Sequence, residues 1–197
     1  MDIDTLRQEI IQAFHTHWEH NDKAHRVEHF EEVYQTALVI QQRLGLTYDP
    51  KLILFAAYFH DLFAWSRKNH QELSCEFIYD TDHPLIEQYL NREERNLVAV
   101  ACLEHRASFD GQFTHMFSEL INSADRGLPG DVQAMLERAM AYRSHRYPEE
   151  PVEVCKAASV QHLKDKFGKG GYARYPDLYK KAFGKELTAQ QEVISRL

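Results

Sequence analysis

Apolar residues at helical spacing, with glycine and proline confined to the gaps between such segments, constrain this 197-residue chain more than any other feature. Only 8 glycines and 6 prolines occur, and they mark short loops between helices. Near the N-terminus, Leu6, Ile10 and Phe14 repeat with a period near 3.6 residues, as on one face of an amphipathic helix. The pattern predicts an all-α fold, a compact helical bundle with a C-terminal helical extension.

The most apolar segment is residues 52–59 (LILFAAYF), which follow Asp49-Pro50, a pair typical of a helix start. Eight apolar residues in a row could also form a buried strand. We favour a helix because Ala56 and Ala57 interrupt any β-branched pattern and no partner strand is visible. Further helices are predicted over about 25–44, 69–80, 91–107, 112–125, 129–142, 151–167 and 188–196.

Composition excludes several classes of protein. The formal net charge of −7 does not suit a surface that holds a nucleic acid polymer through many phosphates. Cys75, Cys102 and Cys155 lie far apart without a CxxC pair, which favours reduced thiols over disulfides or a cysteine zinc site. The N-terminus lacks the pattern of a signal peptide, and no stretch approaches the roughly 20 apolar residues needed to cross a bilayer. We therefore expect a cytoplasmic protein that does not contact a membrane.

Histidines and aspartates carry most of the chemical information, and the chain has 12 histidines. His25 and His29 are four residues apart, which would place both rings on one face of the predicted second helix. His60 and Asp61 close the most apolar segment, where a buried carboxylate needs a partner or a cation. Asp125 ends another apolar stretch. Each feature alone is weak evidence for a metal site, since a His-x-x-x-His pair more often lies on a helix face without binding a metal. The ordered set of these residues is stronger evidence.

This ordered set resembles that of the HD superfamily of metal-dependent phosphohydrolases, in which His…His-Asp…Asp binds a divalent metal. The matching segments are HRVEHFEEVYQTA (25–37), LFAAYFHDLF (54–63), HQELSC (70–75), VAVACLEHR (98–106) and INSADRGL (121–128). The segment VQHLKDKF (160–167) is similar to a C-terminal helix of some small members. The resemblance implies an HD-type domain over residues 1–167, with residues 168–197 as a C-terminal extension packed on the same domain.

By this resemblance, four side chains would bind the ion: His29, His60, Asp61 and Asp125. Two imidazoles and two carboxylates suit Mn²⁺, Fe²⁺, Co²⁺, Ni²⁺ or Mg²⁺, and they leave room for water and a phosphate oxygen. Related proteins with two metals carry further histidines between the His-Asp pair and the last aspartate. His70, His83 and His105 lie in that interval, but His83 precedes Pro84 in a predicted loop. We therefore favour one divalent ion and leave a second open.

Side chains near this set are candidates for catalysis and substrate binding. His25 could hydrogen-bond a phosphate, and Glu72 could orient the attacking water or act as general base. For both residues, an exposed helix position without a catalytic role is the alternative. His105 and Arg106 follow an apolar run and would enter the pocket from another helix, as substrate contacts.

The tail contains a basic and aromatic cluster around a glycine-rich segment, residues 164–175. Within it, Lys166 and Arg174 could neutralise substrate phosphates. A solvated helix end followed by a turn explains the same residues equally well.

The resemblance implies hydrolysis of a phosphate ester or anhydride bond in a nucleotide, with Asp61 required for catalysis. A nucleoside triphosphate pyrophosphohydrolase or triphosphohydrolase and a 5′-nucleotidase are close alternatives. A phosphodiesterase acting on a dinucleotide and a non-catalytic nucleotide-binding regulatory module are weaker alternatives. Oligomeric state stays open, because apolar helix faces can be buried within one chain or across a homodimer.

Overall fold

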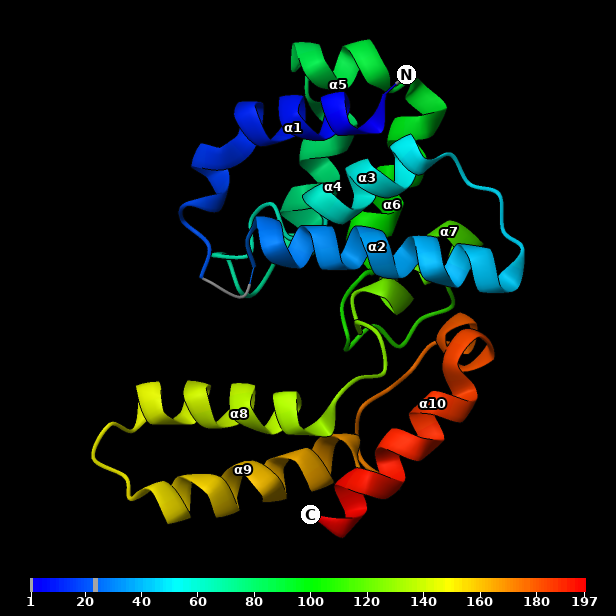
Figure 1. The fold of residues 1–197 in the computed structure, drawn as a ribbon. Helices are drawn as coiled ribbons and strands as arrows, with labels where there is room; N and C mark the ends of the chain where they lie inside the picture. Colours follow the sequence, from blue (N-terminus) through cyan, green and yellow to red (C-terminus); the bar gives the residue numbers. More distant parts are fainter. Residues whose placement is uncertain (1, 23–24) are drawn as a thin grey trace. The chain divides into compact units, whose positions relative to one another are not determined.

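The apolar stripes of the sequence form the buried faces of ten α-helices in the computed structural model, which describes residues 2–22 and 25–197 (Figure 1). These residues form no strand, so the predicted all-α class is confirmed. In chain order the helices are α1 (Ile3–Trp18), α2 (Val27–Leu44), α3 (Pro50–Phe59), α4 (His70–Asp80), α5 (Pro84–Tyr89), α6 (Arg92–Glu104), α7 (Met116–Ala124), α8 (Val132–Arg146), α9 (Val152–Phe167) and α10 (Asp177–Arg196).

The chain divides into two compact units, neither of which is one continuous stretch. Unit 1 comprises Met1–Gly127 and Pro176–Ala182, and unit 2 comprises Leu128–Tyr175 and Phe183–Leu197. The last boundary falls inside α10 at Phe183, where a φ of −131° and a ψ of 16° interrupt the helical backbone. The predicted division at residue 167 stays a prediction, and the tail beyond it contributes residues to both units.

Helix α3 is the centre of unit 1. Asp49 caps its first turn by accepting a hydrogen bond from the Lys51 backbone N–H, and Pro50 supplies the preset φ of a first helical residue. Every residue from Leu52 to Phe59 is buried, because α1, α2, α6 and α7 pack around the helix. A helix that is apolar on all sides is stable only in such surroundings. Its C-terminal end is therefore fixed in the interior of the unit.

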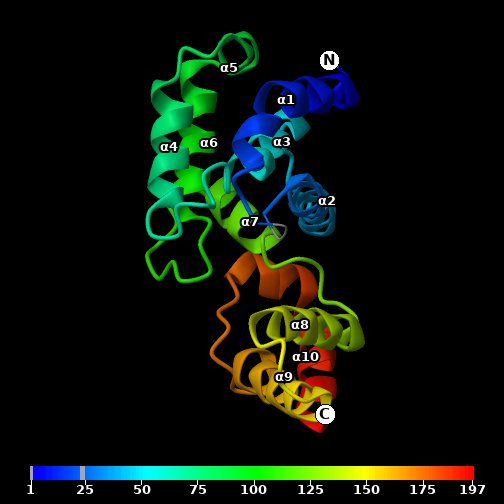
Figure 2. The same cartoon turned by 90° about the vertical axis from the view of Figure 1, so that its left-hand side faces the viewer.

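Helices α4 and α6 lie side by side and run in opposite directions (Figure 2). Asn91 and Glu94 start α6 with a reciprocal capping box. Because the two helices are antiparallel, the first residue of α4 and the last residues of α6 lie at the same end of the pair. This arrangement determines which side chains meet near α3.

Several predicted boundaries differ from the structure by about two to four residues, and three differences matter most. Helix α2 begins at Val27 and not at His25, because Arg26 has the extended backbone of an N-cap residue (φ −127°, ψ −172°). His25 is therefore outside the helix, and its expected place on the helix face with His29 is wrong. The segment after His83 forms the short helix α5 and not only a loop. Helix α10 begins at Asp177, earlier than the predicted start near residue 188.

Unit 2 is built on the antiparallel pair α8 and α9, which lie beside one another in both views (Figures 1 and 2). Its buried cluster consists of Val132, Leu136, Leu163 and Ile194. In the described ranges, none of the helices combines the length and the apolar character that crossing a bilayer requires. The cytoplasmic location stays a prediction.

Candidate metal centre

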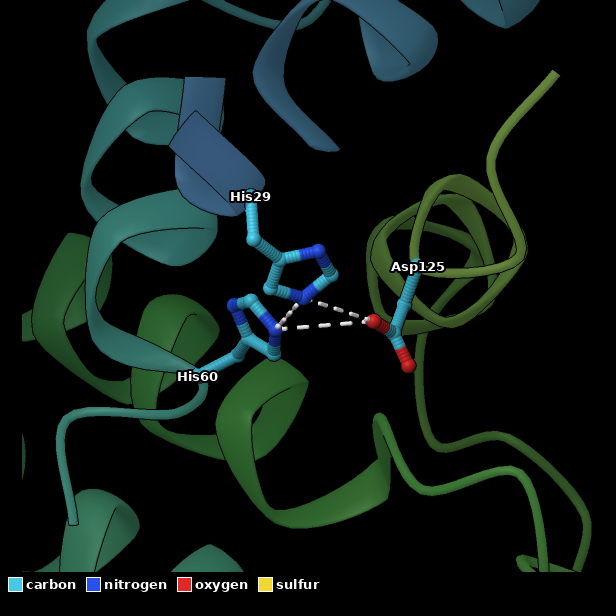
Figure 3. A group of neighbouring side chains, drawn as sticks. All are labelled: His29, His60 and Asp125. Carbon is cyan, nitrogen blue, oxygen red and sulfur yellow. Dashed lines mark hydrogen bonds and ion pairs between the residues drawn. The ribbon is translucent and has the colours of Figure 1, made fainter. Parts of the chain in front are cut away.

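The ends of three helices carry the four predicted metal ligands. His29 lies in the first turn of α2, His60 and Asp61 directly follow the last residue of α3, and Asp125 directly follows α7. Helix α2 packs against both α3 and α7, so these helix ends meet. Figure 3 shows the two imidazole rings and the Asp125 carboxylate directed toward one another.

The donor atoms of these residues converge on a small volume. The Nε2 atom of His29 lies 3.3 Å from His60 Nε2 and 3.2 Å from Asp125 Oδ1. The Nε2 atom of His60 lies 3.6 Å from Asp125 Oδ1 and 3.4 Å from Asp61 Oδ2. Donor atoms about 2.1 Å from a common ion are about 3.0–3.4 Å apart at octahedral or tetrahedral angles. Three of these separations fall in this range. The His60–Asp125 separation of 3.6 Å and the His29–Asp61 separation of 3.9 Å exceed it by a few tenths of an ångström.

Backbone carbonyls fix the orientation of two rings in the centre. His60 Nδ1 donates to the Ala57 carbonyl at 2.8 Å, and His105 Nδ1 donates to the Cys102 carbonyl at 2.6 Å. Because a carbonyl only accepts, the proton of each neutral ring lies on Nδ1, and Nε2 presents its lone pair. Metal-ligating histidines typically bind the ion through one ring nitrogen and donate a hydrogen bond from the other.

A second group of histidines faces the other oxygen of Asp61. The Oδ1 atom of Asp61 lies 3.3 Å from His70 Nε2 and 3.3 Å from His105 Nε2. The two Nε2 atoms are themselves 3.3 Å apart. The meeting follows from the antiparallel pair, because His70 is the first residue of α4 and His105 directly follows α6. Asp61 therefore presents one oxygen to each group.

Electrostatics in the centre separate the charged groups from the neutral ones. Burial opposes charge on His60, yet the neighbouring Asp61 and Asp125 carboxylates raise its pKa to about 10. Burial also opposes charge on both carboxylates, but the adjacent histidines hold the pKa of each well below its ordinary value. Burial lowers the pKa of His70 to about 4 against the attraction of Asp61, so this ring is neutral near pH 7.

A hollow of about 280 Å³ opens over the centre. Its lining includes the side chains of His25, Arg67 and Arg106 together with Asp61. His25 Nδ1 lies 2.6 Å from a carboxylate oxygen of Asp22, and its Nε2 atom lies 3.8 Å from Asp61 Oδ2. The hollow thus joins the metal-ligand set to two guanidinium groups and an imidazole, which is the environment expected around a phosphate.

The sequence model of the HD domain matches residues 26–157, more than half of the chain. The chain belongs to the HD-domain family. Members of this family are typically metal-dependent phosphohydrolases, and the His and Asp groups of this HD domain are suited to a divalent metal. Comparisons with curated proteins and with solved structures bring no match.

Two buried asparagines hold the loops that carry the ligands of the HD domain. Asn21 donates from Nδ2 to the carbonyls of His25 and Asp61 and accepts from the Trp65 backbone N–H. Asn122 donates from Nδ2 to the carbonyls of Glu104 and Arg106 at 2.7 and 3.1 Å. Each asparagine thereby ties together segments that are distant in sequence, so the ligand-bearing ends of α3 and α6 are fixed by side chains as well as by packing.

Three other residues predicted for the site are not among those that line the hollow. Glu72 is exposed on α4 and is not among the residues that line the hollow of the HD domain. Lys166, whose ammonium lies 4.9 Å from the Phe167 ring centre, and the exposed Arg174 belong to unit 2. The catalytic role of Glu72 and the substrate roles of Lys166 and Arg174 stay predictions.

The prediction named His70 only as a possible histidine of a two-metal centre, and it omitted Arg67 from the site. The sequence held a signal for His70, because His70 lies at the start of one predicted helix and His105 near the end of another. If two such helices pack antiparallel, the start of the first lies beside the end of the second. Arg67 lies in the turn region between α3 and α4, where no periodicity indicates its direction. His83, the third histidine of the interval, instead accepts a hydrogen bond from the Leu85 backbone N–H and caps α5.

Proposed function

We propose that this HD domain hydrolyses a phosphate ester or anhydride bond in a nucleotide, with two divalent ions held on either side of Asp61. The observation that supports two ions, in place of the single ion favoured from the sequence, is that both Asp61 oxygens face histidines. Oδ1 lies 3.3 Å from His70 and His105. Oδ2 lies 3.4 Å from His60, 3.8 Å from His25 and 3.9 Å from His29. The first ion would be held by His29, His60, Asp61 and Asp125, and the second by Asp61, His70 and His105. When bound, such ions polarise a phosphoryl oxygen and make water a stronger nucleophile.

The residues around the hollow would bind the phosphate and supply a proton. Arg67 and Arg106 can pair with phosphoryl oxygens and offset the charge that develops during transfer. Hydrolysis adds a hydroxyl to phosphorus and a proton to the leaving oxygen. Asp22 accepts from Nδ1 of His25, which lines the hollow. In its doubly protonated form the ring also carries a proton on Nε2, and delivery of that proton to the leaving oxygen would return the ring to its neutral form.

The nucleotide part of the proposal rests on the family resemblance. Nucleoside triphosphate pyrophosphohydrolase or triphosphohydrolase and 5′-nucleotidase activities are both compatible with a phosphate bound over Asp61. The histidine pair on Asp61 Oδ1 favours a second candidate, a phosphodiesterase acting on a dinucleotide, because two ions can bind both the attacking and the leaving oxygen. For each of these activities, we propose a small phosphate-bearing substrate and a cytoplasmic location of the protein.

The test measures phosphate, pyrophosphate and triphosphate release from nucleoside mono-, di- and triphosphates. For linear and cyclic dinucleotides it measures the nucleotides formed, since cleavage of a phosphodiester bond releases no free phosphate. Each substrate is assayed with Mn²⁺, Co²⁺, Ni²⁺, Fe²⁺ and Mg²⁺. The product distinguishes the candidates: phosphate from a monophosphate indicates a nucleotidase, and pyrophosphate or triphosphate release indicates the triphosphate hydrolases.

Two variants make the assay specific to the centre. Asp61→Ala should abolish metal-dependent turnover, whereas His15→Ala, at an exposed position in the last turn of α1, should retain it. Activity retained in Asp61→Ala would refute the assignment of the centre. Bound metal with no turnover of any substrate would instead support the non-catalytic regulatory module.

A further inference from the structure

A groove of about 480 Å³ lies along α8 and α9, wholly within unit 2 and separate from the residues of the metal centre. Its volume falls within the range of about 300–1,000 Å³ typical of small-molecule sites. Apolar contact surface in the groove comes from Met135, Ala139, Leu163 and Phe167, and the tyrosines at positions 142 and 147 contribute ring faces. An apolar or aromatic molecular body fits this lining.

The charge in the groove is positive. Its lining includes Arg138, Arg143, Arg146 and His162, and none of its lining residues is acidic. Glu150 neutralises Arg143 through two hydrogen bonds of 2.6 and 2.7 Å. Across the part of the chain that the structure describes, Arg138 and Arg146 form no ion pair, so two positive charges remain uncompensated.

Arg146 is oriented by the aromatic side chains around it. It donates to the Tyr142 hydroxyl at 3.3 Å and lies 5.8 Å from the Tyr147 ring centre. A guanidinium held against aromatic rings is a preorganised contact for an anionic group and for an aromatic ring stacked beside it.

Ser159 supplies a polar group in the same lining. The residue is 3% exposed, and its hydroxyl has no hydrogen-bond partner within the described residues. A serine within a helix usually satisfies its hydroxyl on the carbonyl four residues earlier, and a buried hydroxyl left unpaired is costly. The Ser159 hydroxyl is therefore available to a hydrogen-bonding atom of a bound molecule.

We propose that the groove between α8 and α9 binds a small aromatic organic anion. The anionic group pairs with Arg138 and Arg146, and the aromatic body lies against Phe167 and the apolar side chains of both helices. The binding site is independent of the proposed hydrolytic reaction, since none of its residues belongs to the metal centre.

The probe is 1-anilinonaphthalene-8-sulfonate, compared with its uncharged analogue N-phenyl-1-naphthylamine, by fluorescence titration of the full-length, metal-loaded protein. The double variant Arg138→Gln/Arg146→Gln should weaken binding of the sulfonate by about tenfold or more, as expected for lost charge-assisted contacts. The same variant should change binding of the neutral analogue by less than about twofold. Arg196→Gln, at an exposed position outside the groove lining, is the matched control and should leave both affinities unchanged.

A second variant tests whether the probe occupies the groove itself. Ala158 lies in the lining, so Ala158→Phe should remove binding of both probes while circular dichroism shows that helical content is retained. The proposal is overturned by a lack of saturable sulfonate binding to the native protein. It is also overturned by equal loss of the two probes in the arginine variant, or by sulfonate binding that survives Ala158→Phe in the folded protein.

Discussion

Asp61 differs from the other acidic residue of the centre in that both of its carboxylate oxygens face histidine nitrogens. Asp125 offers a single oxygen, Oδ1, to the histidines of the first group. Asp61 Oδ2 faces that first group, whereas its Oδ1 faces His70 and His105. In the proposed two-ion centre, Asp61 would be a ligand of both ions and Asp125 of one, so the two aspartates should have different effects when they are removed.

The first prediction concerns metal stoichiometry. Asp61→Ala should lose both ions, because it removes a ligand from each position. Asp125→Ala should lose only the first, with an affinity drop of at least about 100-fold, since even partners outside the ligand shell contribute about 10–100-fold. Metal content after dialysis against micromolar Mn²⁺ measures the effect. Equal stoichiometry in the two variants would contradict a bridging role for Asp61.

The second prediction concerns the proton on His60. In the ion-free protein its pKa is raised to about 10, so the ring is protonated at pH 7.5 and stabilises the fold by pairing with Asp61 and Asp125. That contribution is present below the ordinary pKa of about 6.5 and is lost as the pH rises through about 10. A metal binds only the neutral ring, so binding should release about one proton, and affinity should rise about tenfold per pH unit from pH 7 to 9.

Calorimetric titration of Mn²⁺ in buffers of different ionisation enthalpy checks this prediction. The apparent binding enthalpy should vary linearly with buffer enthalpy, with a slope near one proton for each ion bound at the first position. A slope of zero at pH 7.5 would show that His60 is already neutral before the ion arrives.

At the scale of helices, the end of α6 depends on a side chain from α7. The last carbonyls of a helix have no hydrogen-bond partner within the helix. Asn122 supplies partners here by donating from Nδ2 to the carbonyls of Glu104 and Arg106. These carbonyls flank His105, so the asparagine positions a ligand of the second histidine group. Its own Oδ1 accepts from Arg126, which follows Asp125.

The third prediction follows from this contact. Asn122→Ala should lower the free energy of unfolding of unit 1 by about 2–3 kcal/mol, because it leaves buried carbonyls without donors. The substitution should also lower the affinity for the second ion more than the affinity for the first. Both tryptophans, Trp18 and Trp65, belong to unit 1, so intrinsic fluorescence in a urea titration reports on this unit.

The matched control is Asn96→Ala, an exposed asparagine on α6. It should be neutral or slightly stabilising, because alanine has the higher helix propensity. A loss of stability equal to that of Asn122→Ala would indicate a general effect of shortening asparagine and not a specific contact.

Local sequence signals predicted most helices but not the geometry between them. The Asp49-Pro50 start and the apolar run identified α3, and the ordered histidines and aspartates identified four residues that the structure brings together. The start of α2 was missed because Arg26, an arginine without a side-chain cap, carries no N-cap signal. The convergence of His70 and His105 depends on the packing of α4 against α6, a tertiary contact that periodicity within one segment cannot reveal.

At the scale of the whole molecule, the C-terminal tail completes unit 1. The Leu178 backbone N–H donates to Glu119 at 2.8 Å, and the Ala182 carbonyl accepts from Arg43 at 2.9 Å. Leu178 and Tyr179 are buried. Residues 176–182 therefore contribute both apolar burial and hydrogen bonds to the unit that contains the metal centre.

The fourth prediction compares two truncations. A chain ending at residue 167 should lose about 3–5 kcal/mol of unit 1 stability, from the buried leucine and tyrosine of the tail. A chain ending at residue 182 keeps these side chains. Its unit 1, followed by tryptophan fluorescence, should therefore unfold at a urea concentration close to that of the full-length protein. Equal unit 1 stability in the two truncations would show that the segment 176–182 does not stabilise that unit.

The late return of the chain to unit 1 also affects how the protein is made. Translation proceeds from the N-terminus at about 5–20 residues per second, and domains generally fold as they emerge. All the proposed metal ligands are synthesised by residue 125, but the last segment of their unit follows only after most of unit 2. On the ribosome, the nascent chain therefore spends several seconds with its metal ligands complete and part of the unit 1 core uncovered. In that interval an early-bound ion or a chaperone would influence yield more than in the finished protein.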